Sequence, residues 1–171
     1  FHIQNDFPDT PDKNNNSDQV YGEYRYQRNF ADRIKASLGA AGTWTRSNSA
    51  LYGDHNSMNQ AVFGQADWKV VQRLNTSLGL RFERYVLDGE VEYSTPVFRA
   101  GLNYQVRDQT YLRASFGQGY RFPSVAEKFT ATNVGSLKIF PNQSLVSETG
   151  WSSEVGVKQG LEMGEWQGYL D

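Results

Sequence analysis

The chain has 171 residues and a formal net charge of −2, from 17 basic and 19 acidic side chains. This balance gives neither the positive field that attracts nucleic acid nor the acidic block of a solvating tail, so no nucleic-acid partner is expected. The absence of cysteine excludes disulfides, thiolate metal sites and cysteine nucleophiles. Aromatic residues make up 14% of the chain, which is more amphipathic surface than a core of this size needs.

No stretch approaches the roughly 18 consecutive apolar residues that a membrane-spanning helix requires, and the mean hydropathy is −0.66. A helical membrane protein is therefore excluded, whereas a membrane β-barrel is not, because its strands alternate apolar and polar residues. The chain begins at Phe1 without a start Met or a signal-like segment. We expect a cut N-terminus, with any export signal outside this chain.

Residues 1–19 are expected to form a loop, because Asn, Asp, Pro and Ser dominate residues 5–19. From residue 20 the chain divides into segments of about 10 to 13 residues with period-two alternation, which predicts strands with two chemically different faces. In residues 33–46, for example, Ile34, Leu38 and Trp44 occupy even positions. Six strands are expected within residues 20–120, at 20–30, 33–46, 60–70, 76–86, 97–107 and 110–120. Two more are expected within residues 149–171, the second beginning near Glu165 and truncated at Asp171.

The connections between these segments alternate in length. Short ones are expected near residues 30–33, 71–75, 107–110 and 160–164, and longer polar ones near 46–59, 87–95 and 121–148. A meander with all its long loops at one end is typical of outer-membrane barrels. The expected fold class is therefore all-β, an antiparallel up-and-down meander of about eight strands that is part of a larger transmembrane β-barrel. Even-numbered residues should face outward through residue 120, and odd-numbered residues after it.

The most specific pattern lies in residues 111–171. Its elements are Ser115 to Pro123, Glu127, Pro141-Asn142, Leu145, Glu148-Thr149 and Glu154 to Lys158. In this order they resemble the strand-loop-strand block of TonB-dependent outer-membrane receptors. One departure is Gln143, where the family usually has a second proline.

The resemblance implies that residues 1–171 are a partial receptor barrel, a fragment of a barrel of about 22 strands in the cell outer membrane. Implied partners are outer-membrane lipid, a plug domain of the same parent chain, and the TonB complex, contacted through parent regions absent here. Such receptors bind a scarce nutrient at the cell surface, of the siderophore-iron, haem, cobalamin or glycan type, and import it with TonB-derived energy. The resemblance implies no enzymatic activity and no cofactor.

The candidate site residues are Arg121 and Glu127, at the outer rim beside the long extracellular loop 121–148. They are placed to pair across the base of that loop, either as a tether or as ligand contacts. His2 and His55 fall in predicted loops, without a Ser nucleophile or a second His at metal spacing. They are expected to be solvated, and neither a catalytic nor a metal site is expected.

The inward-facing charged side chains are expected to form a wet network in the lumen, with possible contact to a plug. They are Arg81, Glu83, Arg99, Arg113, Glu154 and Lys158.

Two other interpretations remain at this point. One is a complete small barrel of eight strands with a structural or adhesion role, its interior filled by side chains. The other is a soluble β-sandwich that serves as a binding module. An arginine placed at Leu80 or Leu102 should distinguish them, because at mid-membrane it costs about 2 to 4 kcal/mol in lipid.

Overall fold

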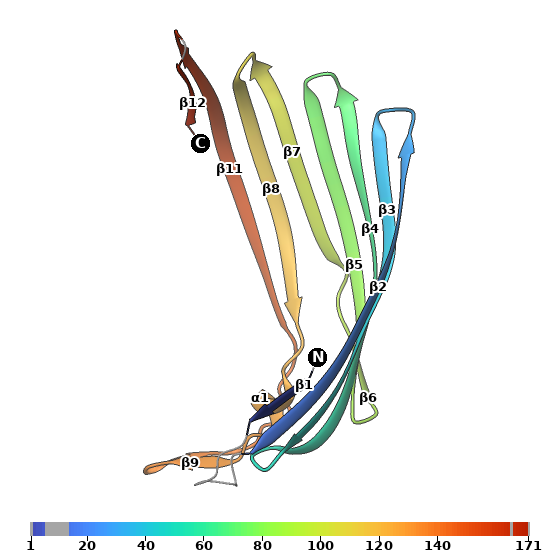
Figure 1. The fold of residues 1–171 in the computed structure, drawn as a ribbon, viewed down its shortest axis with the longest axis vertical. Coiled ribbons are helices and arrows are strands. Elements are labelled where there is room, and N and C mark those ends of the chain that lie inside the picture. Colours follow the sequence, from blue (N-terminus) through green and yellow to red (C-terminus); the bar gives the residue numbers. More distant parts are fainter. Residues whose placement is uncertain (1, 6–13, 165, 171) are drawn as a thin grey trace.

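One antiparallel sheet of ten strands makes up most of the chain (Figure 1). The structure is a computed structural model that describes residues 2–5, 14–164 and 166–170. Neighbouring strands follow the order β1-β2-β3-β4-β5-β7-β8-β11-β12, and β6 also pairs with β5. A separate sheet of two strands, β9 and β10, lies in the connection between β8 and β11.

The strands of the large sheet are β1 His2–Asn5, β2 Asn15–Phe30, β3 Ile34–Ser49, β4 Gly53–Val71, β5 Leu74–Leu87, β6 Glu90–Tyr93, β7 Val97–Arg107, β8 Thr110–Arg121, β11 Glu148–Met163 and β12 Trp166–Leu170. The connection between β8 and β11 contains α1 Val125–Phe129, β9 Thr132–Val134 and β10 Leu137–Ile139. The all-β antiparallel meander is confirmed. The expected count of about eight strands was low by two, because β1 and β6 also join the sheet. Within the described residues, no helix has the length and apolar composition needed to cross a membrane.

The two faces of the sheet differ in chemistry because side chains alternate along each strand. From β3 to β8, the exposed large apolar side chains lie almost all at even positions, as Leu38, Val62 and Leu78 do. In β11 they lie at odd positions, and Val155 is 82% exposed. The register pairs Val155 with Ala114 of β8, so the odd positions of β11 share a face with the even positions of β8. The expected change of outward parity after residue 120 is confirmed.

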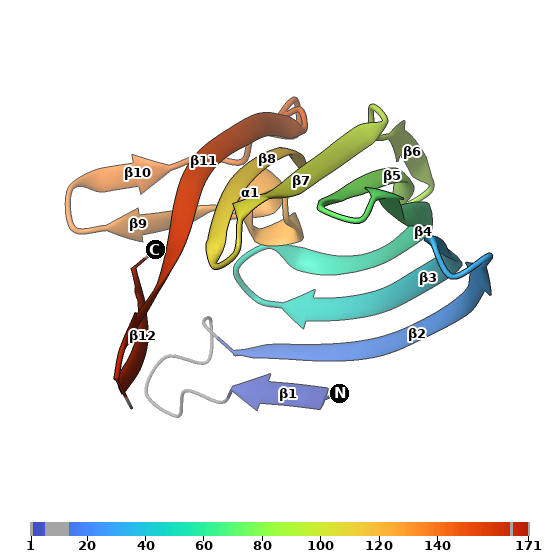
Figure 2. The ribbon, with the colours of Figure 1, turned by 90° about the horizontal axis from the view of Figure 1, so that it is seen from above.

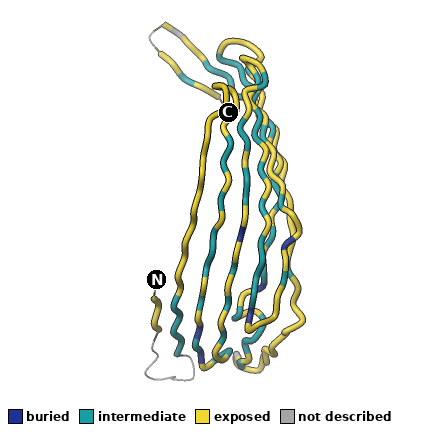
Figure 3. The backbone as a smooth tube through the Cα atoms, turned by 90° about the vertical axis from the view of Figure 1, so that its right-hand side faces the viewer, coloured by how far each residue is buried: buried dark blue, intermediate teal, exposed yellow. Residues whose placement is uncertain are grey.

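The sheet is a single curved layer with the form of a trough (Figure 2). Among the described residues, the buried apolar ones are Ala61 and Leu87, so the sheet has no packed core of its own. Exposed and half-buried residues follow one another along its strands (Figure 3). Apolar exposure of this extent marks a surface that another apolar medium covers. A β-sandwich would need a second sheet packed on the first, which the described strands do not form.

The sheet is also open, because β1 and β12 stand at opposite ends of its strand order. A complete small barrel would join its first and last strands edge to edge. The described residues therefore form part of a wall and not a closed eight-stranded barrel.

The two ends of the sheet differ as expected. Connections of two or three residues, at 31–33, 72–73 and 108–109, lie at one end. The connections that contain β6 and α1 lie at the other end, which is lowest in Figure 1. In outer-membrane barrels the short turns are periplasmic and the long loops extracellular. We therefore call the lower end in Figure 1 the extracellular end.

The expected loop at residues 46–59 was wrong. β3 continues to Ser49 and β4 begins at Gly53, so three residues connect two long strands. Backbone pairing persists through this hairpin, as between Ser47 and His55. Both faces of this hairpin are polar because it extends past the apolar part of the sheet on the extracellular side. The alternation of apolar and polar residues is lost there, although the strands continue.

The expected loop at residues 87–95 contains β6, which folds back onto β5. The turn is Asp88-Gly89, with φ of 51° and 92°. Positive φ at both central residues defines the tight hairpin turn that Asp-Gly favours. This region is therefore a short hairpin on the extracellular side of the membrane-facing part of β5.

The expected loop at residues 1–19 was wrong in two parts. His2–Asn5 is β1 and residues 15–19 belong to β2, and the two strands pair with each other. Polar side chains do not prevent this pairing, because the backbone bonds to its neighbours whatever the side chains are. Asn15, for instance, is paired with Ser49 of β3. Residues 6–13 lie outside the described residues.

Candidate functional site

The candidate residues Arg121 and Glu127 meet at the base of the 122–147 connection. Two guanidinium nitrogens of Arg121 donate to the two carboxylate oxygens of Glu127, at 2.8 and 3.0 Å. The third, Nε, donates to Glu148 at 3.2 Å. Glu148 begins β11 and is paired with Arg121 in the register. The expected pairing of Arg121 with Glu127 is confirmed, whereas ligand contact by either residue stays a prediction.

The same carboxylate fixes the start of α1. Ser124 is the N-cap residue, and Glu127 accepts hydrogen bonds from its backbone N–H and its hydroxyl, both at 2.8 Å. In return, the Glu127 N–H donates to the Ser124 hydroxyl at 3.3 Å. This reciprocal arrangement is a capping box, which the sequence pattern Ser-x-x-Glu signals. We call Arg121, Ser124, Glu127 and Glu148 the rim clamp.

Four donated hydrogen bonds, two of them from a guanidinium, concentrate positive potential on the Glu127 carboxylate. The hydrogen bonds from Arg121, followed by those from the backbone and side chain of Ser124, lower the pKa of Glu127 to about 2. Glu127 is therefore ionised throughout the physiological range. The rim clamp holds the end of β8, the start of α1 and the start of β11 in one arrangement.

A second contact joins the 122–147 connection to the β3–β4 hairpin. The ring of Phe129, at the end of α1, stacks on the imidazole of His55 with centroids 4.0 Å apart. His55 Nδ1 lies 2.5 Å from a carboxylate oxygen of Asp88, and Nε2 lies 2.6 Å from the carbonyl oxygen of Tyr52. Only 12% of the His55 side chain is exposed. The expectation of a solvated loop histidine was wrong for His55, because the connection folds back over it.

His2 differs from His55 in its surroundings. It lies in β1 and not in a loop, and its ring nitrogen Nδ1 is 2.6 Å from Asp18. Its side chain is 54% exposed, so the expected contact with solvent holds for His2.

A third set of contacts fixes the two ends of the connection against the β5–β6 hairpin and β8. Glu92 of β6 accepts hydrogen bonds from the backbone N–H and the hydroxyl of Ser147. The Tyr120 hydroxyl donates to the backbone carbonyl of Tyr93 at 3.2 Å. Phe122 packs against the ring of Tyr120, with the ring centroids 4.8 Å apart. The connection is therefore attached to β8, to the β3–β4 hairpin and to the β5–β6 hairpin.

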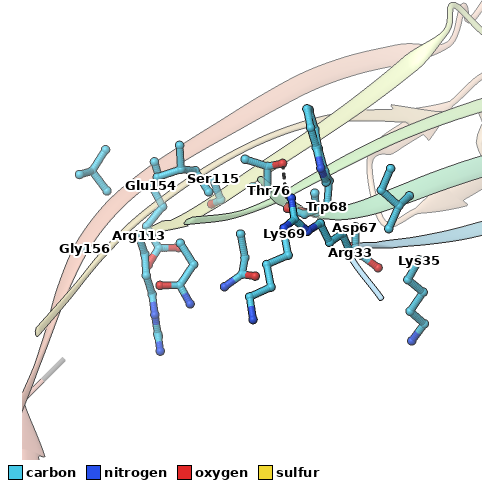
Figure 4. Close-up of a pocket in the computed structure, with 18 of the residues that line it drawn as sticks. Arg33, Lys35, Asp67, Trp68, Lys69, Thr76, Arg113, Ser115, Glu154 and Gly156 are labelled. Carbon is cyan, nitrogen blue, oxygen red and sulfur yellow. Dashed lines mark hydrogen bonds between the residues drawn. The ribbon is translucent and has the colours of Figure 1, made fainter. Parts of the chain in front are cut away.

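A hollow opens on the concave face of the sheet, near the short-turn end (Figure 4). Its lining comes from β2 and the turn that follows it, and from β3, β4, β5, β7, β8 and β11. The side chains of Lys35, Lys69 and Arg113 extend to one side of the sheet, and Trp68 extends to the other (Figure 4). Asn103 also lines the hollow, and its side-chain oxygen is buried without a hydrogen-bond partner. This face is polar and charged, as expected for a lumen.

Of the expected inward charged network, the pair Arg81 and Glu83 is seen in contact, on the extracellular side of the hollow. Arg81 pairs with Glu83 two residues on, and the Arg81 guanidinium lies 5.5 Å from the centre of the Phe63 ring. Arg25 approaches the same ring at 5.4 Å. Sequence reasoning identified Arg81 and Glu83 from their parity, but missed Phe63, whose ring covers Gly39 on the inner face. The signal for this contact is the pairing of Phe63 with Gly39 across β3 and β4.

Metal-binding groups do not gather in the described ranges, 2–5, 14–164 and 166–170. No three His, Asp or Glu side chains there are placed to hold an ion.

A single curved antiparallel sheet with an apolar convex face, a charged concave face and long connections at one end defines a wall segment of an outer-membrane β-barrel. A family model described as "TonB dependent receptor-like, beta-barrel" matches residues 3–171. The chain belongs to this family of outer-membrane receptor barrels.

Solved structures share this fold at low sequence identity. The haemophore receptor HasR of Serratia marcescens, a double mutant in complex with its haemophore HasA and haem, has a TM-score of 0.70 and 14% identity over 87% of this chain. The copper transporter OprC has a TM-score of 0.68 and 15% identity over 92%. The FrpB iron transporter of Neisseria meningitidis has a TM-score of 0.65 and 11% identity over 89% of this chain. The matches cover 30%, 30% and 28% of those chains, respectively. No curated protein sequence matches the chain.

Proposed function

We propose that this chain forms the wall of a transporter that binds a scarce nutrient at the cell surface and imports it with energy from the TonB complex. The observation that carries the proposal is the family match over residues 3–171. The proposed cargo belongs to one of four classes: siderophore-iron, haem, cobalamin or a glycan. The proposed partners are outer-membrane lipid on the convex face and a plug domain of the parent protein on the concave face.

The charge distribution supports a plug on the concave face. Polar side chains, including Lys69, Arg113 and Asn103, line its hollow. A buried amide oxygen without a partner, such as that of Asn103, normally finds a donor from protein or water. A polar domain seated in the lumen supplies such donors. A lipid-facing surface does not.

We propose that the rim clamp supports ligand binding by holding the extracellular connection in place. All three guanidinium nitrogens of Arg121 already contact carboxylates. A ligand that bound Arg121 directly would have to displace Glu127 or Glu148. A tether is therefore the role that its contacts favour for Arg121.

The proposed transport is tested in the source bacterium with the full-length protein. The gene that encodes it is deleted, and uptake of a radiolabelled nutrient from each of the four classes is measured. We expect uptake of one class to be lost, to return with the wild-type gene, and to fail in a strain that lacks TonB. Uptake that continues without TonB, or a deletion that impairs none of the four, contradicts the proposal.

A further inference from the structure

The surroundings of His55 place a hydrogen-bond acceptor beside each of its ring nitrogens. Nε2 faces the carbonyl oxygen of Tyr52, which is an acceptor only, so Nε2 must carry a hydrogen. Nδ1 faces a carboxylate oxygen of Asp88. An ionised carboxylate is also an acceptor only, so Nδ1 can bond to it only by donating a hydrogen. Both hydrogen bonds can therefore form at once only when the ring is the doubly protonated imidazolium.

Asp88 is held in place by two hydrogen bonds to Asn56. Its other carboxylate oxygen accepts the backbone N–H of Asn56 at 2.9 Å, and the Asp88 N–H donates to the Asn56 carbonyl at 2.9 Å. Asp88 therefore sits in a fixed place at the β5–β6 turn and points one oxygen at His55. A charge-assisted hydrogen bond of this kind is about twice as strong as a neutral one.

The His55 ring is also the surface on which the end of α1 packs. Phe129 stacks on it at 4.0 Å, and a cation over an aromatic face is attracted by the ring quadrupole. Beside this contact, the Ala131 N–H donates to the Leu51 carbonyl at 3.2 Å. The ring of His55 therefore lies between the β5–β6 turn and α1, and touches both.

We propose that His55 is a pH-dependent latch for the extracellular connection 122–147. When the ring is doubly protonated, it holds α1 against the β3–β4 hairpin. When the ring loses a proton, one of its two hydrogen bonds must break and the attraction to Phe129 falls. Imidazole is the side chain whose charge changes between pH 5 and 8, so docking weakens as the pH rises through that range.

The other charged groups on the packed elements do not reproduce this behaviour. Asp54 adjoins His55 in β4, and Glu127 and Lys128 precede Phe129 in α1. Glu127 is held by Arg121. Carboxylates and ammonium groups as a class do not change their charge near neutral pH as an imidazole does. The rim clamp stays closed across the same range, so the start of α1 remains attached while its end, at Phe129, is released from the β3–β4 hairpin.

The test uses the full-length receptor in lipid nanodiscs. Spin labels are attached to cysteines at Ala50, in the β3–β4 turn, and Ser136, in the β9–β10 turn, both exposed positions. The distance distribution between them is measured at pH 5.5 and pH 8.5. We expect one short distance at pH 5.5 and an added longer population at pH 8.5. The ratio of undocked to docked molecules should rise about tenfold, which corresponds to about 1.4 kcal/mol.

His2 provides a matched control, because it makes a similar contact with Asp18 at an exposed position. His55→Gln should remove the pH dependence, and Asp88→Asn should reduce it, whereas His2→Gln should leave it unchanged. Distances in the wild-type receptor that are identical at both pH values overturn the latch without any variant. A pH dependence of these distances that survives in His55→Gln, or that disappears in His2→Gln, also overturns the latch. None of these readouts depends on the transported nutrient.

Discussion

Placing an arginine at Leu80 should destabilise the receptor, because Leu80 lies near the middle of the apolar band. On the outward face of β5 this band runs from Leu74 to Arg84, where the guanidinium donates to Gln60 at 2.8 Å. Ten residues span about 33 Å along the strand, or about 25 Å along the bilayer normal at a tilt of about 40°. Leu80 then lies about 15 Å from the Leu74 edge. A charge at this depth costs about 2 to 4 kcal/mol in lipid.

The matched control is Gln65→Arg. Gln65 is paired with Gly79, so it lies at the same depth, but it faces inward and donates to Asp67 at 2.9 Å. Its replacement should change the free energy of unfolding by less than about 1 kcal/mol, because the lumen face accommodates charge. Both variants of the full-length receptor are unfolded with denaturant in lipid vesicles, and folding is followed by electrophoretic mobility. Equal stability of Leu80→Arg and Gln65→Arg would refute the assignment of the outward face.

The depth along the strand gives a second control. Leu102 is paired with Thr76, which places it close to the short-turn edge of the band and not at mid-membrane as expected from the sequence. Leu102→Arg should therefore cost less than Leu80→Arg, since the penalty falls to about 0 to 1 kcal/mol near the interface. An equal or larger cost at Leu102 would show that the band is centred elsewhere.

Other substitutions test the inner face and the rim. Gly39→Ala should destabilise the barrel by about 1 to 3 kcal/mol, because the added methyl overlaps the Phe63 ring and lies 2.8 Å from a backbone oxygen. Gly150→Ala should have little effect in the same unfolding assay, because nothing lies within 4 Å of the added methyl. Glu127→Gln should increase hydrogen exchange in α1 several-fold and leave the unfolding midpoint of the barrel unchanged. In the wild type, the pKa of Glu127 is depressed, so the ionised carboxylate stabilises α1 fully above pH 4.5 and loses this effect as the pH falls toward 2. Hydrogen exchange in α1, corrected for intrinsic rates, should therefore increase only below pH 4.5.

The outward face and the strand order could be predicted because one physical rule governs them. A strand between lipid and a wet lumen must alternate apolar and polar residues, and Leu78, Leu80 and Phe82 show the pattern without interruption. The same rule fails where the strands leave the membrane. At Ser47 and His55 both faces are polar, so the period-two signal disappears while the backbone pairing continues.

The candidate site was predictable only where its residues are close in sequence. Arg121 and Glu127 lie six positions apart in a recognisable motif, and the pattern from Ser124 to Glu127 signals the helix start. The stack of His55 on Phe129 joins two segments that are far apart in the chain. The contact between Glu92 and Ser147 does the same. Such contacts follow from how the long connection folds back over the hairpins, which no local pattern encodes.

The orientation of the wall in the membrane is tested most directly by a lipid-accessibility scan of two strands. Single spin labels are placed at residues 98–105 of β7 and 151–158 of β11 in the full-length receptor, and their collisions with oxygen and with a water-soluble nickel complex are compared. Even positions in β7 and odd positions in β11 should contact lipid, because the register joins them on one face through β8. The same parity in both strands, or no alternation in either, would contradict the assignment of this chain to the wall of an outer-membrane barrel.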